Sequence, residues 1–144
     1  MSDISFDTGA EVNFSAYRVI LQETINDVLK KIKISDEGIK WFIVEEEKFK
    51  EMDRVSLNKL SPISPFIKEK NRYGCCDMER RIIWISTEAI HTAPFPVERV
   101  FPKRRPNLLV NVILDELTHI VTKRKHGDEI YEEQFESFKR KYYS

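Results

Sequence analysis

The sequence predicts an α+β fold with an N-terminal helix, a small three-stranded and mainly antiparallel sheet, and two C-terminal helices. Apolar residues recur at helical spacing near both ends of the chain, while short runs of β-branched and aromatic residues lie between them. The length of 144 residues suits one domain, and we find no internal repeat or Gly/Ser linker. We therefore expect a loosely held arm at residues 1–12 and a single domain at residues 13–144.

The first helix is expected from about residue 14 to residue 33, after a candidate cap at Asn13. Its apolar residues lie three or four positions apart: Phe14, Tyr17, Leu21, Ile25, Val28 and Ile32. This spacing gathers them on one side of a helix, which should cover one side of the core.

The strands are expected at residues 39–44, 72–76 and 81–86, where β-branched and aromatic residues are frequent. Residues 77–80 separate the last two runs as the turn of a hairpin would, so these two strands should be antiparallel. The charged stretch from 45 to 53 should leave the sheet.

Three further elements are expected in the second half of the chain. Residues 87–91 suit a short helical turn, and the prolines between 94 and 106 then favour an extended crossing. Residues 108–121 are apolar on nearly all sides, so this helix should be buried within the domain. The last helix, at about 128–143, is indicated by aromatic residues at helical spacing: Tyr131, Phe135, Phe138 and Tyr142.

The composition excludes several classes of protein. The 24 basic and 24 acidic residues give a formal net charge of zero, so no global field attracts nucleic acid or an anionic membrane. The chain begins without a basic, apolar leader, and no stretch approaches the roughly 18 apolar residues of a spanning helix. The adjacent Cys75 and Cys76 are poorly placed for an ordinary disulfide. We expect a cytoplasmic protein with reduced thiols and no membrane partner.

A group of potential metal ligands lies on the expected buried helix. Asn111, Asp115 and His119 are four residues apart and therefore share one helix face, with Glu116 next to it. Two coordinating groups at this spacing can hold one ion, as in the HExxH motif of zincins. His126 offers a third ligand after six intervening residues, directly before a glycine.

The segment Asp-Glu-Leu-Thr-His-Ile-Val-Thr-Lys-Arg-Lys-His-Gly-Asp-Glu-Ile, from Asp115 to Ile130, resembles the SprT-like zinc metallopeptidases. Their pattern is HELxH, a short gap and HGxxF, so Asp115 stands for the first histidine and Ile130 for the aromatic residue. The resemblance implies a metal held by Asp115, His119 and His126. It also implies that Glu116 is the general base and acid in hydrolysis of a protein or peptide substrate.

The resemblance extends more faintly upstream, because an amphipathic helix, a small antiparallel sheet and an apolar active-site helix come in this order in the family. It implies a minimal zincin-like fold for residues 13–144. The aspartate leaves the metal open: it binds zinc through oxygen, but a set of two histidines and one carboxylate also suits iron or manganese.

The alternative is a degenerate zincin fold that binds no metal and acts as a protein- or DNA-binding module. Buried carboxylates at positions 115 and 116 would then need other partners, because an unpaired buried charge costs several kcal/mol. The candidates are Arg80, Arg81, Lys103, Arg104 and Arg105.

Two basic triplets bracket the buried helix, and SprT-like proteins often act on DNA-associated proteins. A nucleic-acid partner is therefore the further expectation, through Lys103, Arg104, Arg105, Lys123, Arg124 and Lys125. The second triplet is equally explained by the favourable interaction of cations with the C-terminal end of a helix.

Five other residues leave a role open. Asn111 either makes local hydrogen bonds or orients Asp115. Tyr131, Tyr142 and Tyr143 could offer a hydroxyl that stabilises an oxyanion, but helical spacing makes Tyr131 and Tyr142 core-facing by default. His91 is expected at the surface.

Overall fold

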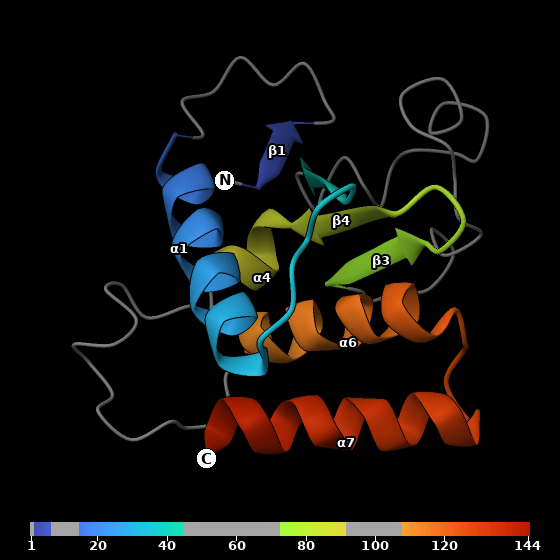
Figure 1. Ribbon diagram of the computed structural model, residues 1–144. Coiled ribbons are helices and arrows are strands. Elements are labelled where there is room, and N and C mark those ends of the chain that lie inside the picture. Colours follow the sequence, from blue (N-terminus) through green and yellow to red (C-terminus); the bar gives the residue numbers. More distant parts are fainter. Residues whose placement is uncertain (1, 7–14, 45–72, 92–107) are drawn as a thin grey trace.

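The computed structural model describes residues 2–6, 15–44, 73–91 and 108–144, which form a four-stranded mixed sheet with helices packed against it (Figure 1). The α+β class is therefore confirmed. The elements in chain order are β1 (Asp3–Phe6), α1 (Ser15–Ile32), β2 (Lys40–Val44), β3 (Gly74–Asp77), β4 (Ile82–Ser86), α4 (Thr87–His91), α6 (Leu108–Thr122) and α7 (Glu129–Tyr143). Each helix expected from the sequence is found within one or two residues of its predicted bounds.

The sheet differs from the three-stranded antiparallel sheet that the sequence predicted. Its strand order is β1-β2-β4-β3, and only the β3–β4 hairpin is antiparallel. β2 pairs with both β1 and β4 in parallel. A parallel pair needs a long crossover rather than a turn, and such a long-range pairing leaves no local signal in the sequence. β4 lies between β2 and β3 in the sheet, and every one of its residues is buried.

The fourth strand lies within the stretch that we expected to be a loosely held arm. β1 pairs with β2 in register, with Ile4 opposite Trp41. Its start is tied down further, because Ser2 Oγ donates a hydrogen bond to Asp36 Oδ2 over 2.5 Å. The same oxygen accepts from Trp41 Nε1 over 2.9 Å. Residues 7–14 of the expected arm and helix start, including the candidate cap Asn13, lie outside the described residues.

The main core lies between the sheet and the helices. α6 contacts β3 and β4 on one side and α7 on the other, and α1 packs across the ends of both helices (Figure 1). This sandwiched position explains why α6 is apolar on nearly all sides: Leu109, Ile113 and Leu117 are all fully buried. The predicted burial of this helix is therefore confirmed.

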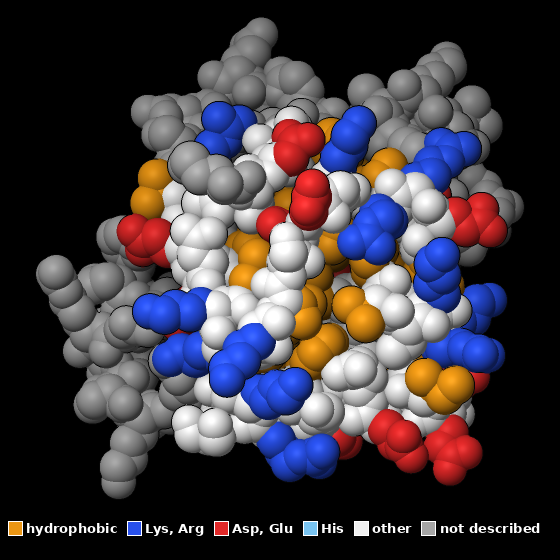
Figure 2. Space-filling model, viewed as in Figure 1, with side chains coloured by type: hydrophobic (Ala, Val, Ile, Leu, Met, Phe, Trp, Pro, Cys, Tyr) orange, Lys and Arg blue, Asp and Glu red, His pale blue; other side chains and the backbone are white. Residues whose placement is uncertain are grey.

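None of the helices that the structure describes combines the length and apolarity that crossing a bilayer requires. On the face seen in Figure 2, hydrophobic side chains show at the centre, and Lys and Arg are distributed around them among Asp and Glu. This mixture agrees with the balanced charge of the chain.

Candidate metal centre

The structure brings together the three side chains that the sequence singled out as metal ligands. Asp115 and His119 project from α6, and His126 comes from the loop between α6 and α7. Asp115 Oδ1 lies 3.3 Å from Nε2 of His119 and 3.3 Å from Nε2 of His126. The two Nε2 atoms are 3.1 Å apart. One donor atom from each residue therefore meets at a single point.

These distances fit a metal ion. Ligand atoms placed tetrahedrally about 2.05 Å from zinc lie about 3.3 Å from one another. The observed triangle, with sides of 3.1, 3.3 and 3.3 Å, has nearly that size. The three side chains would need little movement to hold an ion of this kind.

The loop between the helices places His126 through a short series of local constraints. α6 ends because Lys123 adopts a left-handed φ of 55°, while its N–H still donates to the His119 carbonyl over 2.8 Å. Gly127 has a φ of 87°, a conformation that favours glycine. This requirement gives the glycine after His126 a physical reason.

α7 begins directly after this turn. Asp128 is its N-cap, and Oδ1 of this residue accepts a hydrogen bond from the Ile130 N–H over 2.8 Å. The Gly127 N–H donates to Oε1 of Glu132 over 3.2 Å. His126 is thereby held at the entry to a well-capped helix, with its side chain 59% exposed.

The orientation of His119 is set by the backbone. Its Nδ1 lies 2.7 Å from the carbonyl oxygen of Arg124, which can only accept, so Nδ1 carries the proton and Nε2 faces the cluster. Burial lowers the pKa of His119, but the hydrogen bonds with Asp115 and with the Arg124 carbonyl raise it overall. A metal-ligating histidine is commonly oriented in this way.

Asp115 is held as a carboxylate. Burial raises its pKa, but the hydrogen bonds with His119 and Tyr131 outweigh this effect and lower the pKa below its ordinary value. The cluster therefore combines a negative charge with imidazole nitrogens that face it, an arrangement that favours a bound cation.

Tyr131 is a residue of this site that the sequence did not assign. Its side chain is fully buried, as its helical spacing predicts, but its hydroxyl donates a hydrogen bond to Asp115 Oδ1. Burial, followed by the Asp115 carboxylate, raises the pKa of Tyr131, so the hydroxyl remains a donor. The sequence feature that could have assigned Tyr131 to the site is its position in the first turn of the helix that follows His126.

Glu116, the expected base, follows Asp115 directly on α6, so it lies beside the ligand face of the helix rather than on it. It is 3% exposed and forms a hydrogen bond with the thiol of Cys76 in β3. Burial raises the pKa of Cys76, and the nearby Glu116 carboxylate raises it further. Neither Cys75 nor Cys76 is disulfide-bonded, in agreement with the prediction.

The close contact between β3 and α6 depends on Gly74. A Cβ at this position would lie 2.6 Å from Val112 Cγ1 and 3.1 Å from the Trp84 carbonyl oxygen. Only glycine therefore lets the edge strand approach the helix closely enough for Cys76 to reach Glu116. The sequence gave no direct indication of this packing.

The other candidates make contacts elsewhere. Arg80 Nε lies 3.9 Å from Asp77 Oδ2, and Arg81 donates to the Glu37 carbonyl over 3.4 Å, so neither supplies the buried ion pair considered for a metal-free domain. Asn111 accepts a hydrogen bond from the Tyr143 hydroxyl over 2.6 Å rather than orienting Asp115.

His91 is exposed, as expected, and hydrogen-bonds with the Tyr17 hydroxyl. The second basic triplet, Lys123, Arg124 and Lys125, is exposed on the loop beside the cluster. Arg124 also pairs with Asp128 over 3.7 Å. The first triplet, at 103–105, lies outside the described residues.

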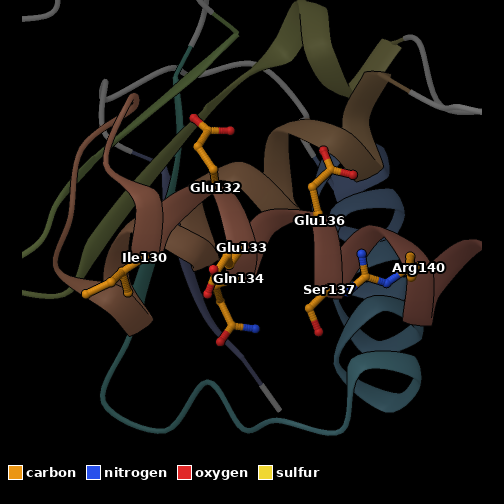
Figure 3. A pocket seen from close by; sticks show the side chains of 7 residues that line it. All are labelled: Ile130, Glu132, Glu133, Gln134, Glu136, Ser137 and Arg140. Carbon is orange, nitrogen blue, oxygen red and sulfur yellow. The ribbon is translucent and has the colours of Figure 1, made fainter.

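The lining of a surface hollow of about 630 Å³ includes none of the three residues of the ligand cluster (Figure 3). Its lining comes from α7 alone: Ile130, Glu132, Glu133, Gln134, Glu136, Ser137 and Arg140. A hollow along one helix lacks the surrounding walls that bury a small ligand. The ligand cluster, rather than this hollow, is therefore the candidate site.

Comparisons with known proteins add no relative: no family model matches the chain, and no curated protein or solved structure matches it. The resemblance to SprT-like metallopeptidases therefore remains a prediction from the sequence motif.

Proposed function

We propose that this protein binds one divalent transition-metal ion, zinc foremost, through Asp115, His119 and His126, and that it hydrolyses peptide bonds at this centre. The observation that carries the proposal is the triangle of donor atoms, with sides of 3.1 to 3.3 Å. Two of the three residues come from α6 and the third from the loop that leads into the capped start of α7. Their donor atoms have the spacing of zinc ligands.

The donor set supports a catalytic rather than a closed structural centre. Three protein ligands leave a tetrahedral position open, and the 59% exposed side chain of His126 lies on the accessible side. A zinc ion in such a centre supplies the Lewis acidity that activates water and polarises a carbonyl group. Iron or manganese would suit the same donors, so the choice of metal is part of the test.

Glu116 is the residue that we assign as general base. It follows the first ligand directly in the chain, as the glutamate of an HExxH motif does, and its low exposure of 3% favours strong interaction with a nearby proton. In this assignment Glu116 accepts a proton from the attacking water and returns it to the leaving amine.

A second candidate function has an observation in its favour. The contact between Glu116 and Cys76 directs the carboxylate toward β3. If Glu116 stays there, the chain is a degenerate zincin fold that acts as a protein- or DNA-binding module, with or without a metal.

The metal content of the purified protein tests the first part of the proposal. Protein produced without a polyhistidine tag is incubated with zinc, dialysed and analysed by mass spectrometry for metals. We expect one ion per chain, its loss in His119→Ala and His126→Ala, and its retention in His91→Ala. His91 is the matched control, because it is the one histidine of the three in the chain that lies outside the cluster. A wild-type protein without metal would remove the proposal.

Hydrolysis of an unfolded protein substrate tests the second part. We expect Glu116→Gln to keep the metal but to lower the rate about 100- to 10,000-fold, the usual contribution of a general base. Metal-loaded wild-type protein that cleaves no substrate, or a Glu116→Gln variant as active as the wild type, would favour the binding module.

A further inference from the structure

Tyr131 contacts all three of the residues proposed as ligands. Its hydroxyl donates to Asp115 Oδ1, the same oxygen that lies 3.3 Å from each histidine Nε2. Its ring stacks on His119, with centroids 4.6 Å apart and planes 24° apart. The ring of His126 lies against it at 4.7 Å and 64°. One fully buried side chain thus touches every member of the cluster.

The hydroxyl meets a need that arises from the aspartate. An imidazole ligand is oriented through its second ring nitrogen, as the Arg124 carbonyl orients His119. Both oxygens of a carboxylate only accept hydrogen bonds, and the aspartate side chain is shorter than that of histidine, so a donor from outside has to direct the ligating oxygen. Tyr131 supplies this donor from the neighbouring helix, where its burial leaves it little freedom to move.

The position of the tyrosine agrees with this role. In the SprT-like pattern the aromatic residue would fall at Ile130, which is 51% exposed here. The aromatic residue of this chain comes one position later, on the side of α7 that faces α6. The two departures from the pattern, the aspartate at position 115 and the tyrosine at position 131, are therefore joined by one hydrogen bond.

We propose that Tyr131 is the positioning residue of the metal centre, and that Asp115 and Tyr131 together replace the first histidine of the motif. This inference rests on the proposed metal binding. It implies that Asp115 is a functional ligand oriented by Tyr131, rather than a residue left after a metal site was lost.

The variant Tyr131→Phe tests the inference, because it removes the hydroxyl and keeps the ring. Two matched controls remove hydroxyls of the same helix that bond elsewhere. Tyr142→Phe loses the bond to Asp27 Oδ2 at 2.5 Å, and Tyr143→Phe loses the bond to Asn111 Oδ1 at 2.6 Å. Zinc and cobalt affinities are measured by competition with a chromogenic chelator, alongside the cobalt absorption spectrum and thermal unfolding.

We expect Tyr131→Phe to bind both metals about 10- to 100-fold more weakly than the wild type, the usual cost of losing a group that orients a ligand. Its cobalt spectrum should change, while both controls keep wild-type affinity and spectrum. A fall in thermal stability alone, shared by all three variants, would show that the hydroxyl is merely structural and would overturn the inference.

A double-mutant cycle with Asp115→His tests whether Asp115 and Tyr131 act on metal binding as a pair or independently. Once histidine stands at position 115, the tyrosine hydroxyl no longer has a carboxylate to direct, so adding Tyr131→Phe should not weaken metal binding further. Equal losses from Tyr131→Phe in both backgrounds would contradict the pairing. A wild-type protein that binds no metal would instead remove the proposed function, and this inference with it.

Discussion

At two places along the contact between α6 and α7, a tyrosine of α7 donates a hydrogen bond to a side-chain oxygen of α6. Tyr143 donates to Asn111, and Tyr131 donates to Asp115 one helical turn further along α6. The first pair joins two neutral groups. The second ends on a carboxylate oxygen that also lies 3.3 Å from two imidazole nitrogens.

The difference shows what distinguishes a candidate metal centre from ordinary helix packing. At Asn111, the neutral side-chain oxygen accepts the hydroxyl proton of Tyr143, and this contact needs no cation. In the neutral ring of His119 the only proton is used on the Arg124 carbonyl, so Nε2 of that ring and the Asp115 carboxylate both present lone pairs to the same point. Acceptors in excess of protons favour a cation.

The largest effect should come from metal binding itself. At a free zinc concentration of 100 times the dissociation constant, the free energy of unfolding should rise by about 2.7 kcal/mol. His126→Ala should lose this gain at little cost to the metal-free protein, because its side chain is 59% exposed. Chemical unfolding with and without zinc measures both. Equal stabilisation of the wild type and the variant would mean that zinc binds elsewhere. The Asp115 contact would then differ from the Asn111 contact in no functional respect.

A smaller effect should come from changing the two acceptors of α6, Asp115 and Asn111, one at a time and measuring metal affinity. Asp115→Asn keeps the shape and the bond to Tyr131 but loses the charge, so metal affinity should fall by at least about 10- to 100-fold. Asn111→Ala should leave the affinity unchanged and cost about 1 kcal/mol of stability, the usual net value of one hydrogen bond. Isothermal titration with zinc and urea unfolding measure the two quantities. If Asn111→Ala also weakened binding, the two contacts would not be independent.

The sequence predicted those parts of the molecule that depend on local patterns. The apolar stripe that contains Leu21 and Ile25 defined α1, and the all-round apolar run at 108–121 indicated the burial of α6. The candidate ligand set followed from the four-residue spacing of Asp115 and His119 and from the position of His126 directly before a glycine.

The parts that were missed depend on contacts between distant segments. β1 is only four residues long, and its pairing with β2 links residues more than 30 positions apart. The bond from Tyr131 to Asp115 depends on how α7 crosses α6, and the carbonyl of Arg124 has no side-chain signal. The contact of Cys76 with Glu116 requires the close packing that Gly74 allows.

The smallest effect concerns the loop that joins the helices at the Asp115 end. Gly127→Ala places a Cβ where no atom lies within 4 Å, so only its φ of 87° opposes the change. The cost should be roughly 1 kcal/mol of stability, the usual penalty for a left-handed non-glycine residue. Lys125→Ala, an exposed change in the same loop, is the control and should cost nothing measurable. Because the loop carries His126 to the cluster, zinc should offset part of the loss in Gly127→Ala. A variant that unfolds equally with and without zinc would mean that the loop does not present His126 to a metal.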